Sequence, residues 1–205
     1  MKTQIITLFT ALVLSAGIAK TTYAAAPAEN ATYTVLTDVS AINKIEVHGN
    51  VQVYISDGAT DQVKVYNKYY AESALVQSRN GVLTISSYKA EKLVVWVTAA
   101  DLRAISAFDN AEVSSFGDLS KIEFNVDLHN NASAKLSLET YSANVIVADQ
   151  AKASLSGSAN EYSLKYSNAG NIDQTNFVTE NASKTLTTTS VKKPVTSEID
   201  DLADL

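Results

Sequence analysis

Few side chains in this sequence are of the types that carry out catalysis, and those few lie far apart. The chain has no cysteine and two histidines, His48 beside a Gly-Asn pair and His129 before Asn130. Structural zinc sites need Cys or His at short, regular spacings. A serine nucleophile needs a histidine base and, in hydrolases, often a Gly-x-Ser-x-Gly turn. Neither pattern occurs, so we predict structural histidines, no catalytic residue, no metal and no cofactor.

Paired carboxylates are the other possible source of acid–base chemistry, as in sugar-cleaving enzymes. Asp109 and Asp149 occupy equivalent places in a repeat described below, but Asn130 stands at the place between them. Asp57 and Asp61 form a local acidic pair that is too small for a calcium site. We interpret these acids as solvated turn residues and expect a non-enzymatic protein. A carbohydrate-active β-helix enzyme is kept as the alternative.

Aromatic residues remain as candidates for binding. Tyr66, Tyr69 and Tyr70 gather around Lys68. Tyrosine combines an apolar ring with a polar hydroxyl, so such a cluster can stack on sugars or dock a partner. It can equally cover the open end of a domain, which is the interpretation the sequence favours. The three tyrosines are therefore the binding-site candidates.

The elements that position these residues are strands throughout, since apolar residues alternate with polar ones and helical periodicity is scarce. In residues 51–55 three apolar residues alternate with Gln and Tyr. The pairs at 57–58 (Asp-Gly) and 80–81 (Asn-Gly) are hairpin turn signals. The apolar run at 93–97 predicts a strand buried on both faces. We expect hairpin-like strands in this half of the chain.

The second half of the chain repeats. A polar pair followed by alanine recurs at steps of 21, 19 and 18 residues, with an alternating strand before each later copy. The copies are Asp109-Asn110-Ala111, Asn130-Asn131-Ala132, Asp149-Gln150-Ala151 and Ser167-Asn168-Ala169. Strand repeats near twenty residues are typical of solenoids, in which neighbouring repeats complete one core. We predict an all-β, single-domain parallel β-helix (β-solenoid) with rungs of about 18–21 residues, and a β-sandwich is the alternative.

The two ends of the chain differ from the middle. Residues 1–24 combine Lys2, a short apolar run and small residues around Ala24, the pattern of a secretory signal peptide. The run is shorter than the roughly 20 residues of a membrane span, so no transmembrane segment is expected. We predict a lead-in over 25–41, the solenoid over 42–186 and an acidic, disordered tail over 187–205. The protein is expected to be exported, periplasmic or extracellular, and not a lipoprotein, because it lacks cysteine.

The charge balance limits the partners. The chain has 22 acidic and 16 basic residues and a net charge of −6. Such a surface repels nucleic acid, which requires a basic patch. We expect no nucleic-acid partner and a monomer.

A family resemblance rests on the first strands. Residues 47–58, Val-His-Gly-Asn-Val-Gln-Val-Tyr-Ile-Ser-Asp-Gly, resemble the opening of the auto-transporter adhesin head domain, also called the GIN domain. Val63-Lys64-Val65 and Asn80-Gly81-Val82-Leu83-Thr84-Ile85 match the strands that follow in that family. The resemblance covers roughly residues 42–186, although most corners here read Asn-Ala where the family has Ser-Gly.

The resemblance implies a parallel β-helix of the bacterial envelope. An interaction or adhesin-like module that presents a rigid face to a surface glycan or an envelope protein is the function we expect. A carbohydrate-active enzyme, or a structural periplasmic protein without a ligand, are the alternatives.

Overall fold

The computed structural model describes residues 33–36, 39, 41–66 and 74–187, which form twelve strands and one short 3-10 turn. All of these described residues belong to a single compact unit. The predicted signal peptide (1–24) and almost all of the predicted acidic tail lie outside the described residues. Within the described part of the chain, no helix is long and apolar enough to span a membrane.

The strands become longer along the chain. The strands before residue 110 have three to seven residues: β1 (Thr34–Leu36), β2 (Lys44–Gly49), β3 (Val51–Asp57), β4 (Gln62–Val65), β5 (Ala74–Arg79), β6 (Val82–Ser87), β7 (Leu93–Ala99) and β8 (Ala104–Ala107). The later ones have 15 to 17 residues: β9 (Glu112–Leu128), β10 (Ser133–Val147), β11 (Lys152–Tyr166) and β12 (Ile172–Leu186). The 3-10 turn η1 (Ala169–Asn171) separates the last two strands.

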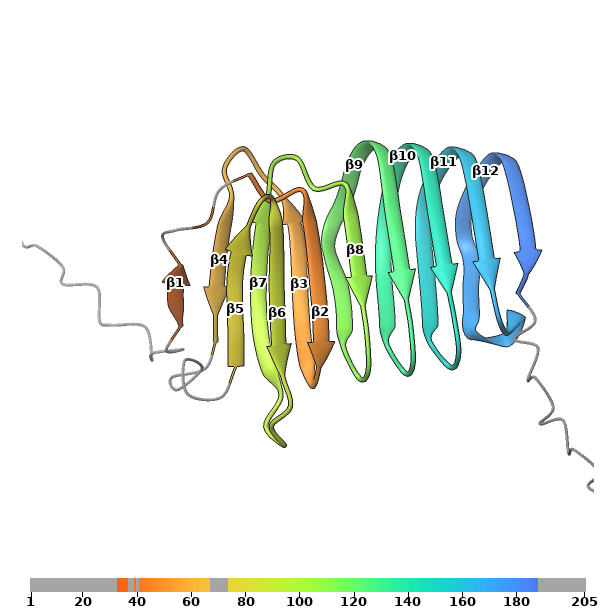
Figure 1. Cartoon of the computed structure of the whole chain (residues 1–205). Coiled ribbons are helices and arrows are strands. Elements are labelled where there is room, and N and C mark those ends of the chain that lie inside the picture. The colour runs from red at the N-terminus through yellow and green to blue at the C-terminus, as the bar shows by residue number, and fades with distance from the viewer. Residues whose placement is uncertain (1–32, 37–38, 40, 67–73, 188–205) are drawn as a thin grey trace, which may run out of the picture. The chain divides into compact units, whose positions relative to one another are not determined.

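The described strands form one curled, open sheet of mixed pairing (Figure 1). Nine strands follow the order β1-β4-β7-β3-β9-β8-β2-β6-β5, while β10, β11 and β12 continue from β9. Contacts of β1 with β4, of β4 with β7 and of β5 with β6 are antiparallel, and the other pairs are parallel. The all-β prediction is confirmed, but the expectation of purely parallel pairing is wrong for these three N-terminal contacts.

Strand β9 joins two rows of shorter strands. Its first residues pair with β3, and its last residues pair with β8, so β3 and β8 lie along the same neighbour at different levels. On its other edge β9 pairs with β10 over nearly its whole length. From β9 onwards, each long strand therefore spans the two levels that are occupied by two separate short strands, β3 and β8, on the other side of β9.

The core lies on the inner side of the curled sheet. Alternate residues of β2, β3, β6 and β7 are fully buried, as in Val51, Val53 and Ile55 of β3. Phe124 of β9 is among the largest fully buried side chains. Towards the C-terminus the buried positions are filled more often by alanine, as at Ala143 and Ala153.

The polar corners of the repeat share one backbone geometry at three of the four predicted places. Asp109, Asn130 and Asp149 have φ of 60°, 58° and 56°. Asp and Asn tolerate this left-handed region better than other side chains. The alanine that ends each of the three corners is fully buried, and its backbone N–H donates to the residue three positions earlier. The small, buried alanine lets the chain turn inward into the next strand.

The fourth predicted copy of the corner is wrong. Ser167, the counterpart of Asp109, Asn130 and Asp149, does not have positive φ, and the side chain of the next residue, Asn168, accepts a hydrogen bond from the Gly170 N–H within η1. The exposed Ala169 therefore does not take the place of the three buried alanines. The offset between paired residues of β11 and β12 is 19 to 20 residues, not the 18 of the sequence motif.

Two expectations for the first half are also corrected. Asp57-Gly58 does not join a hairpin, because β3 pairs with β7 and β9 while β4 pairs with β1 and β7. The same holds for β2 and β3 on either side of Gly49-Asn50, since β2 pairs with β6 and β8. β7 is a strand, but it is buried on one face only, since Val94 and Trp96 are partly exposed. The Asn80-Gly81 hairpin is present, with both residues at positive φ and Arg79 paired with Val82.

Candidate binding face

The outer surface of β7, β3 and β9 carries a group of neighbouring aromatic rings. The ring centroid of Trp96 lies 4.9 Å from that of Tyr54 and 5.5 Å from that of Phe116. Trp96 pairs directly with Tyr54 on one side and with Lys64 of β4 on the other. Phe116 is 66% exposed, which is unusual for so large an apolar side chain. We call Tyr54, Trp96 and Phe116 the aromatic strip.

Tyr66 lies beside this strip. Its backbone N–H donates to Val94 of β7, and its ring centroid is 5.3 Å from that of Tyr33. The ammonium group of Lys64 lies 5.6 Å from the centroid of the Tyr33 ring, a cation–π distance. Tyr69 and Tyr70 lie outside the described residues. The assignment of the three tyrosines as a binding cluster stays a prediction.

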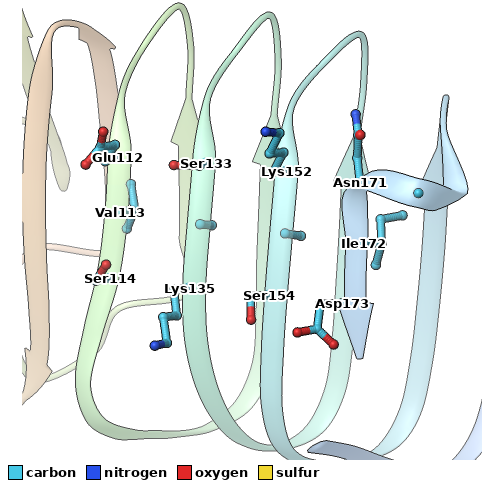
Figure 2. A pocket seen from close by; sticks show the side chains of 13 residues that line it. Glu112, Val113, Ser114, Ser133, Lys135, Lys152, Ser154, Asn171, Ile172 and Asp173 are labelled. Atoms are coloured by element: carbon cyan, nitrogen blue, oxygen red, sulfur yellow. The ribbon is translucent and has the colours of Figure 1, made fainter. Parts of the chain in front are cut away.

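A shallow pocket of about 460 Å³ follows the strip along the same outer surface. Two rows of neighbouring residues run through it from strand to strand. Each row has one residue from β9, one from β10, one from β11 and one from the segment where η1 meets β12. The rows are Ser114, Lys135, Ser154 and Asp173, and Glu112, Ser133, Lys152 and Asn171. In Figure 2 the row that begins at Glu112 lies above the row that begins at Ser114.

The first row joins the aromatic strip directly. Ser114 pairs with Tyr54 of β3, and Ser114 in turn pairs with Lys135 of β10. One line of neighbours therefore runs from Lys64 through Trp96 and Tyr54 into the pocket. Because each neighbour comes from a different strand, the spacing along this line is the strand spacing of about 4.8 Å.

The charges in the pocket are partly compensated. Glu112 Oε1 accepts a hydrogen bond from Lys92 Nζ at 2.7 Å. Asp173 Oδ1 accepts hydrogen bonds from the backbone N–H and the hydroxyl of Thr175, which lower the pKa of the Asp173 carboxyl. Lys135 and Lys152 are exposed, and neither forms an ion pair with any other described residue. The pocket thus holds two lysines without an ionic partner among the described residues, Glu112 paired with Lys92, and Asp173, whose hydrogen-bond partner Thr175 is uncharged.

The two histidines lie on a different part of the surface, where they pack against one ring. Phe108 is stacked between His48 and His129, with centroid distances of 4.6 and 5.1 Å and nearly parallel planes. His48 Nε2 donates to Glu46 Oε1 at 2.9 Å, which is the main cause of the lowered pKa of Glu46. His129 Nε2 lies 2.8 Å from Asp127 Oδ1. Within the described ranges, no group of three His, Asp or Glu residues could hold a metal ion.

The corner acids are held by the asparagine between them. Asn130 Nδ2 donates to Asp109 Oδ1 at 3.0 Å, and the Asn130 backbone N–H donates to Asp149 Oδ2, also at 3.0 Å. Both carboxylates therefore take part in a ladder of hydrogen bonds along the corner. This arrangement fixes the corner and leaves the two acids on opposite sides of Asn130.

A family model covers the whole described sheet beyond β1. The model described as "Putative auto-transporter adhesin, head GIN domain" matches residues 41–192, well over half of the chain. The chain belongs to the GIN-domain family. The resemblance seen in its first strands is thereby confirmed.

Solved structures share the fold of this GIN domain. A putative adhesin from Bacteroides fragilis NCTC 9343 has 17% identity and a TM-score of 0.66, with 77% of each chain covered. Putative adhesins from Parabacteroides distasonis ATCC 8503 and Parabacteroides merdae ATCC 43184 have 16% and 14% identity and TM-scores of 0.62 and 0.60. In both comparisons 75% of this chain and 76% of the other is covered. No curated protein matches the sequence.

The aromatic strip is not among the predicted site residues, because the sequence around Trp96 is typical of a fully buried strand. The apolar run that contains Trp96 predicts burial on both faces, because Val94 and Val95 beside it are apolar too. The useful signal is the alternation in β3, which places Tyr54 on the same face as the polar Gln52 and Ser56. Phe116 follows Ser114 and Ser115 and precedes Gly117, where β9 bends and its register with β10 shifts.

Proposed function

We propose that this GIN domain is a non-enzymatic binding module of the bacterial cell envelope, and that it binds its ligand across the aromatic strip and the adjoining pocket. The observation that carries the proposal is the line of neighbours from Trp96 and Tyr54 to Ser114 and Lys135. It places exposed rings next to available hydrogen-bond donors on one rigid surface. Binding sites commonly combine such apolar anchors with a few polar groups.

The family supports an interaction role. The description of the matching family and the names of three structural neighbours all contain the word adhesin. The histidines pack against Phe108 and the corner acids bond to Asn130, so these groups already have structural roles. A binding role is the one that the exposed side chains of the outer face fit best.

The rigidity of this surface supports the same role. We infer that β9 to β12 are stacked turns of a β-solenoid. Their parallel pairing, the offsets of 19 to 21 residues between neighbours and the repeated alanine corners support this assignment. Stacked turns hold outward side chains at fixed spacing, so little entropy is lost when a long ligand binds.

Export is part of the proposal and has its own test. The expected signal peptide would be removed after Ala24, which leaves a protein that begins at Ala25. Mass spectrometry of the protein recovered from the periplasm or medium of an expressing Gram-negative cell checks this N-terminus. Full-length protein retained in the cytoplasm would contradict it.

Binding itself is tested with the purified protein on immobilised surface glycans and on envelope proteins extracted from Gram-negative cells. We expect the variant Trp96→Ala/Phe116→Ala to lose binding. Tyr141→Ala is the matched control, since Tyr141 is an exposed aromatic residue (59%) that lies outside the strip and the pocket. Glycans recovered after incubation are checked for cleavage products, and their appearance would overturn the non-enzymatic assignment.

A further inference from the structure

We propose that the ligand of this face is an acidic oligosaccharide that lies across the strands, with its rings on the aromatic strip and its carboxylate or sulfate groups held by Lys135 and by Lys152. This inference rests on the proposed function and adds the chemical class of the ligand. Three features of the outer surface support it: the direction of the rows, the rings that begin them and the charge that they reach.

The rows run across the strands and so favour a long, regularly repeating ligand. Lys64, Trp96, Tyr54, Ser114 and Lys135 come from five successive strands of the sheet. Their backbones are about 4.8 Å apart, a distance comparable to the length of one pyranose ring in a chain. Successive sugars of an extended oligosaccharide would therefore meet successive strands.

The aromatic strip supplies the contacts that a sugar ring needs. A pyranose has apolar C–H faces and polar hydroxyl edges. Trp96 and Tyr54 are partly exposed and Phe116 is largely exposed, so the strip offers apolar ring surface to such a face. The serines of the pocket, Ser114 and Ser133, are partly exposed donors and acceptors for the hydroxyl edges.

The charge of the pocket selects an acidic sugar. Lys135 and Lys152 project from adjacent strands and have no ionic partner among the described residues, whereas Glu112 is paired with Lys92. With Glu112 paired with Lys92, these two lysines face one further acid, Asp173, so the pocket carries a small positive charge within a chain of net charge −6. At physiological salt, charges farther away than about 8 Å are largely screened. An acidic group placed beside Lys135 or Lys152 therefore interacts mainly with that lysine and with the few charged groups of the pocket.

The same charge balance disfavours a nucleic acid. A nucleic acid carries one phosphate per nucleotide and needs a long basic surface. This face offers Lys64, Lys135 and Lys152 along its rows, within a protein that is acidic elsewhere. A sugar chain whose acidic groups are few and separated by neutral, ring-shaped units fits this distribution better.

The experiment measures the affinity of the purified protein for matched pairs of hexasaccharides by calorimetry. The pairs are oligomannuronate and mannohexaose, oligogalacturonate and its methyl ester, and O-sulfated cellohexaose and cellohexaose. Oligo-dT is added as a polyanion with bases in place of sugar rings. We expect at least one acidic member to bind about tenfold or more tightly than its neutral counterpart.

Two charge-matched double variants locate the site. Lys135→Ala/Lys152→Ala is expected to weaken the acidic ligand about tenfold or more and to leave the neutral counterpart unchanged. Lys89→Ala/Lys165→Ala removes two exposed lysines outside the pocket and is expected to change neither affinity. Trp96→Ala is expected to weaken both members of the pair.

The outcomes separate this inference from the proposed function. Equal binding of acidic and neutral members, equal binding of oligo-dT, or equal loss in the two lysine variants would each overturn the acidic-sugar assignment. If no hexasaccharide binds while an envelope protein binds in a Trp96-dependent way, the inference fails and the proposed function stands. If the envelope screen also finds no ligand, both fail.

Discussion

The parallel strand pairs before and after Phe108 are formed by segments that are connected in different ways. In the first region β3 pairs with β7 and β9, whose partner residues lie 42 and 60 positions away, as in Val51 with Leu93 and Gln52 with Glu112. In the second region β9 to β12 pair with neighbours only 19 to 21 residues away. The same parallel pairing is therefore reached either by interleaving distant segments or by repeating one segment.

The two regions also fill their cores differently. β2, β3, β6 and β7 bury Ile, Val and Leu completely, whereas β10 and β11 bury several alanines. β12, which follows them, has no fully buried side chain. Apolar burial stabilises by about 25 cal/mol per Å², so each strand of the second region contributes less. Local unfolding is therefore expected to begin at β12 and to reach the first region last.

The largest effect is expected where the two regions meet. Phe124 of β9 is fully buried, and Phe124→Ala should lower the free energy of unfolding by about 3–5 kcal/mol through lost burial and the cavity it leaves. Phe177→Ala in β12 is the control, because Phe177 is only partly buried against Tyr162. Urea unfolding should show a shift for Phe177→Ala no larger than about half of that for Phe124→Ala.

Hydrogen exchange distinguishes the two variants further. Phe124→Ala should raise exchange in both regions, since β9 pairs with β3, β8 and β10. Phe177→Ala should raise it in β11 and β12 alone. Increased exchange in β2 and β3 for Phe177→Ala would show that the two regions unfold as one, contrary to the comparison.

The next effect concerns two glycines of the repeating region. Gly157 of β11 has φ of +97°, and a Cβ there would lie 2.1 Å from the backbone oxygen of Leu138 in β10. Gly157→Ala must push two paired strands apart and should cost about 2–4 kcal/mol. Gly117 of β9 has φ of +81° but no atom within 4 Å of the added Cβ, so Gly117→Ala should cost only about 1 kcal/mol. Thermal unfolding of both variants measures the difference in stability. Equal losses of stability would mean that the positive φ alone, and not the clash with Leu138, sets the cost.

The sequence predicts the second region better than the first because the second region repeats one segment and the first interleaves distant ones. A repeat places equivalent residues at constant spacing, so the corners at Asp109, Asn130 and Asp149 can be recognised from the order of residues alone. The pairing of β2 with β6 and β8 leaves no such trace, because parallel neighbours need no shared turn. Gly49-Asn50 therefore resembles a hairpin turn although it joins strands that do not pair with each other.

The candidate site is predictable only in part. Tyr66 is identified from its type, and the structure places it beside Tyr33. The strip and the pocket depend on register, which decides that Trp96 faces Tyr54 and that Ser114 faces Lys135. Register is set by contacts along whole strands, so single residues carry little information about it.

A smaller effect is expected at the corners that make the second region regular. Asn130→Ala removes the side-chain hydrogen bond to Asp109 and leaves a non-glycine residue at φ of 58°. We expect a loss of about 1–2 kcal/mol. Asn130→Gly, which removes the same bond but tolerates the backbone, should lose about half as much. Chemical denaturation of the pair separates the two contributions, and a larger loss for Asn130→Gly would contradict this account of the corner.

The smallest effect lies in the first region, at the Glu46–His48 pair. The hydrogen bond from His48 lowers the pKa of Glu46 below its ordinary value. A lowered carboxyl pKa means that the pair stabilises the fold at pH above the ordinary value and that this contribution is lost as pH falls through the folded pKa. The Glu46 side chain is 32% exposed and solvent screens the pair, so we expect about 0.5 kcal/mol.

Urea midpoints of the wild type and Glu46→Gln test this sign between about pH 6 and about pH 2. The wild type should be the more stable protein at the upper end, and the difference should disappear at the lower end. Glu91→Gln is the control, since the exposed Glu91 makes no ion pair among the described residues and should show no such trend. A difference that persists at low pH would contradict the ionic role of the Glu46 carboxylate and would assign the effect to packing of its side chain against residues of β6 and β8, the strands beside β2.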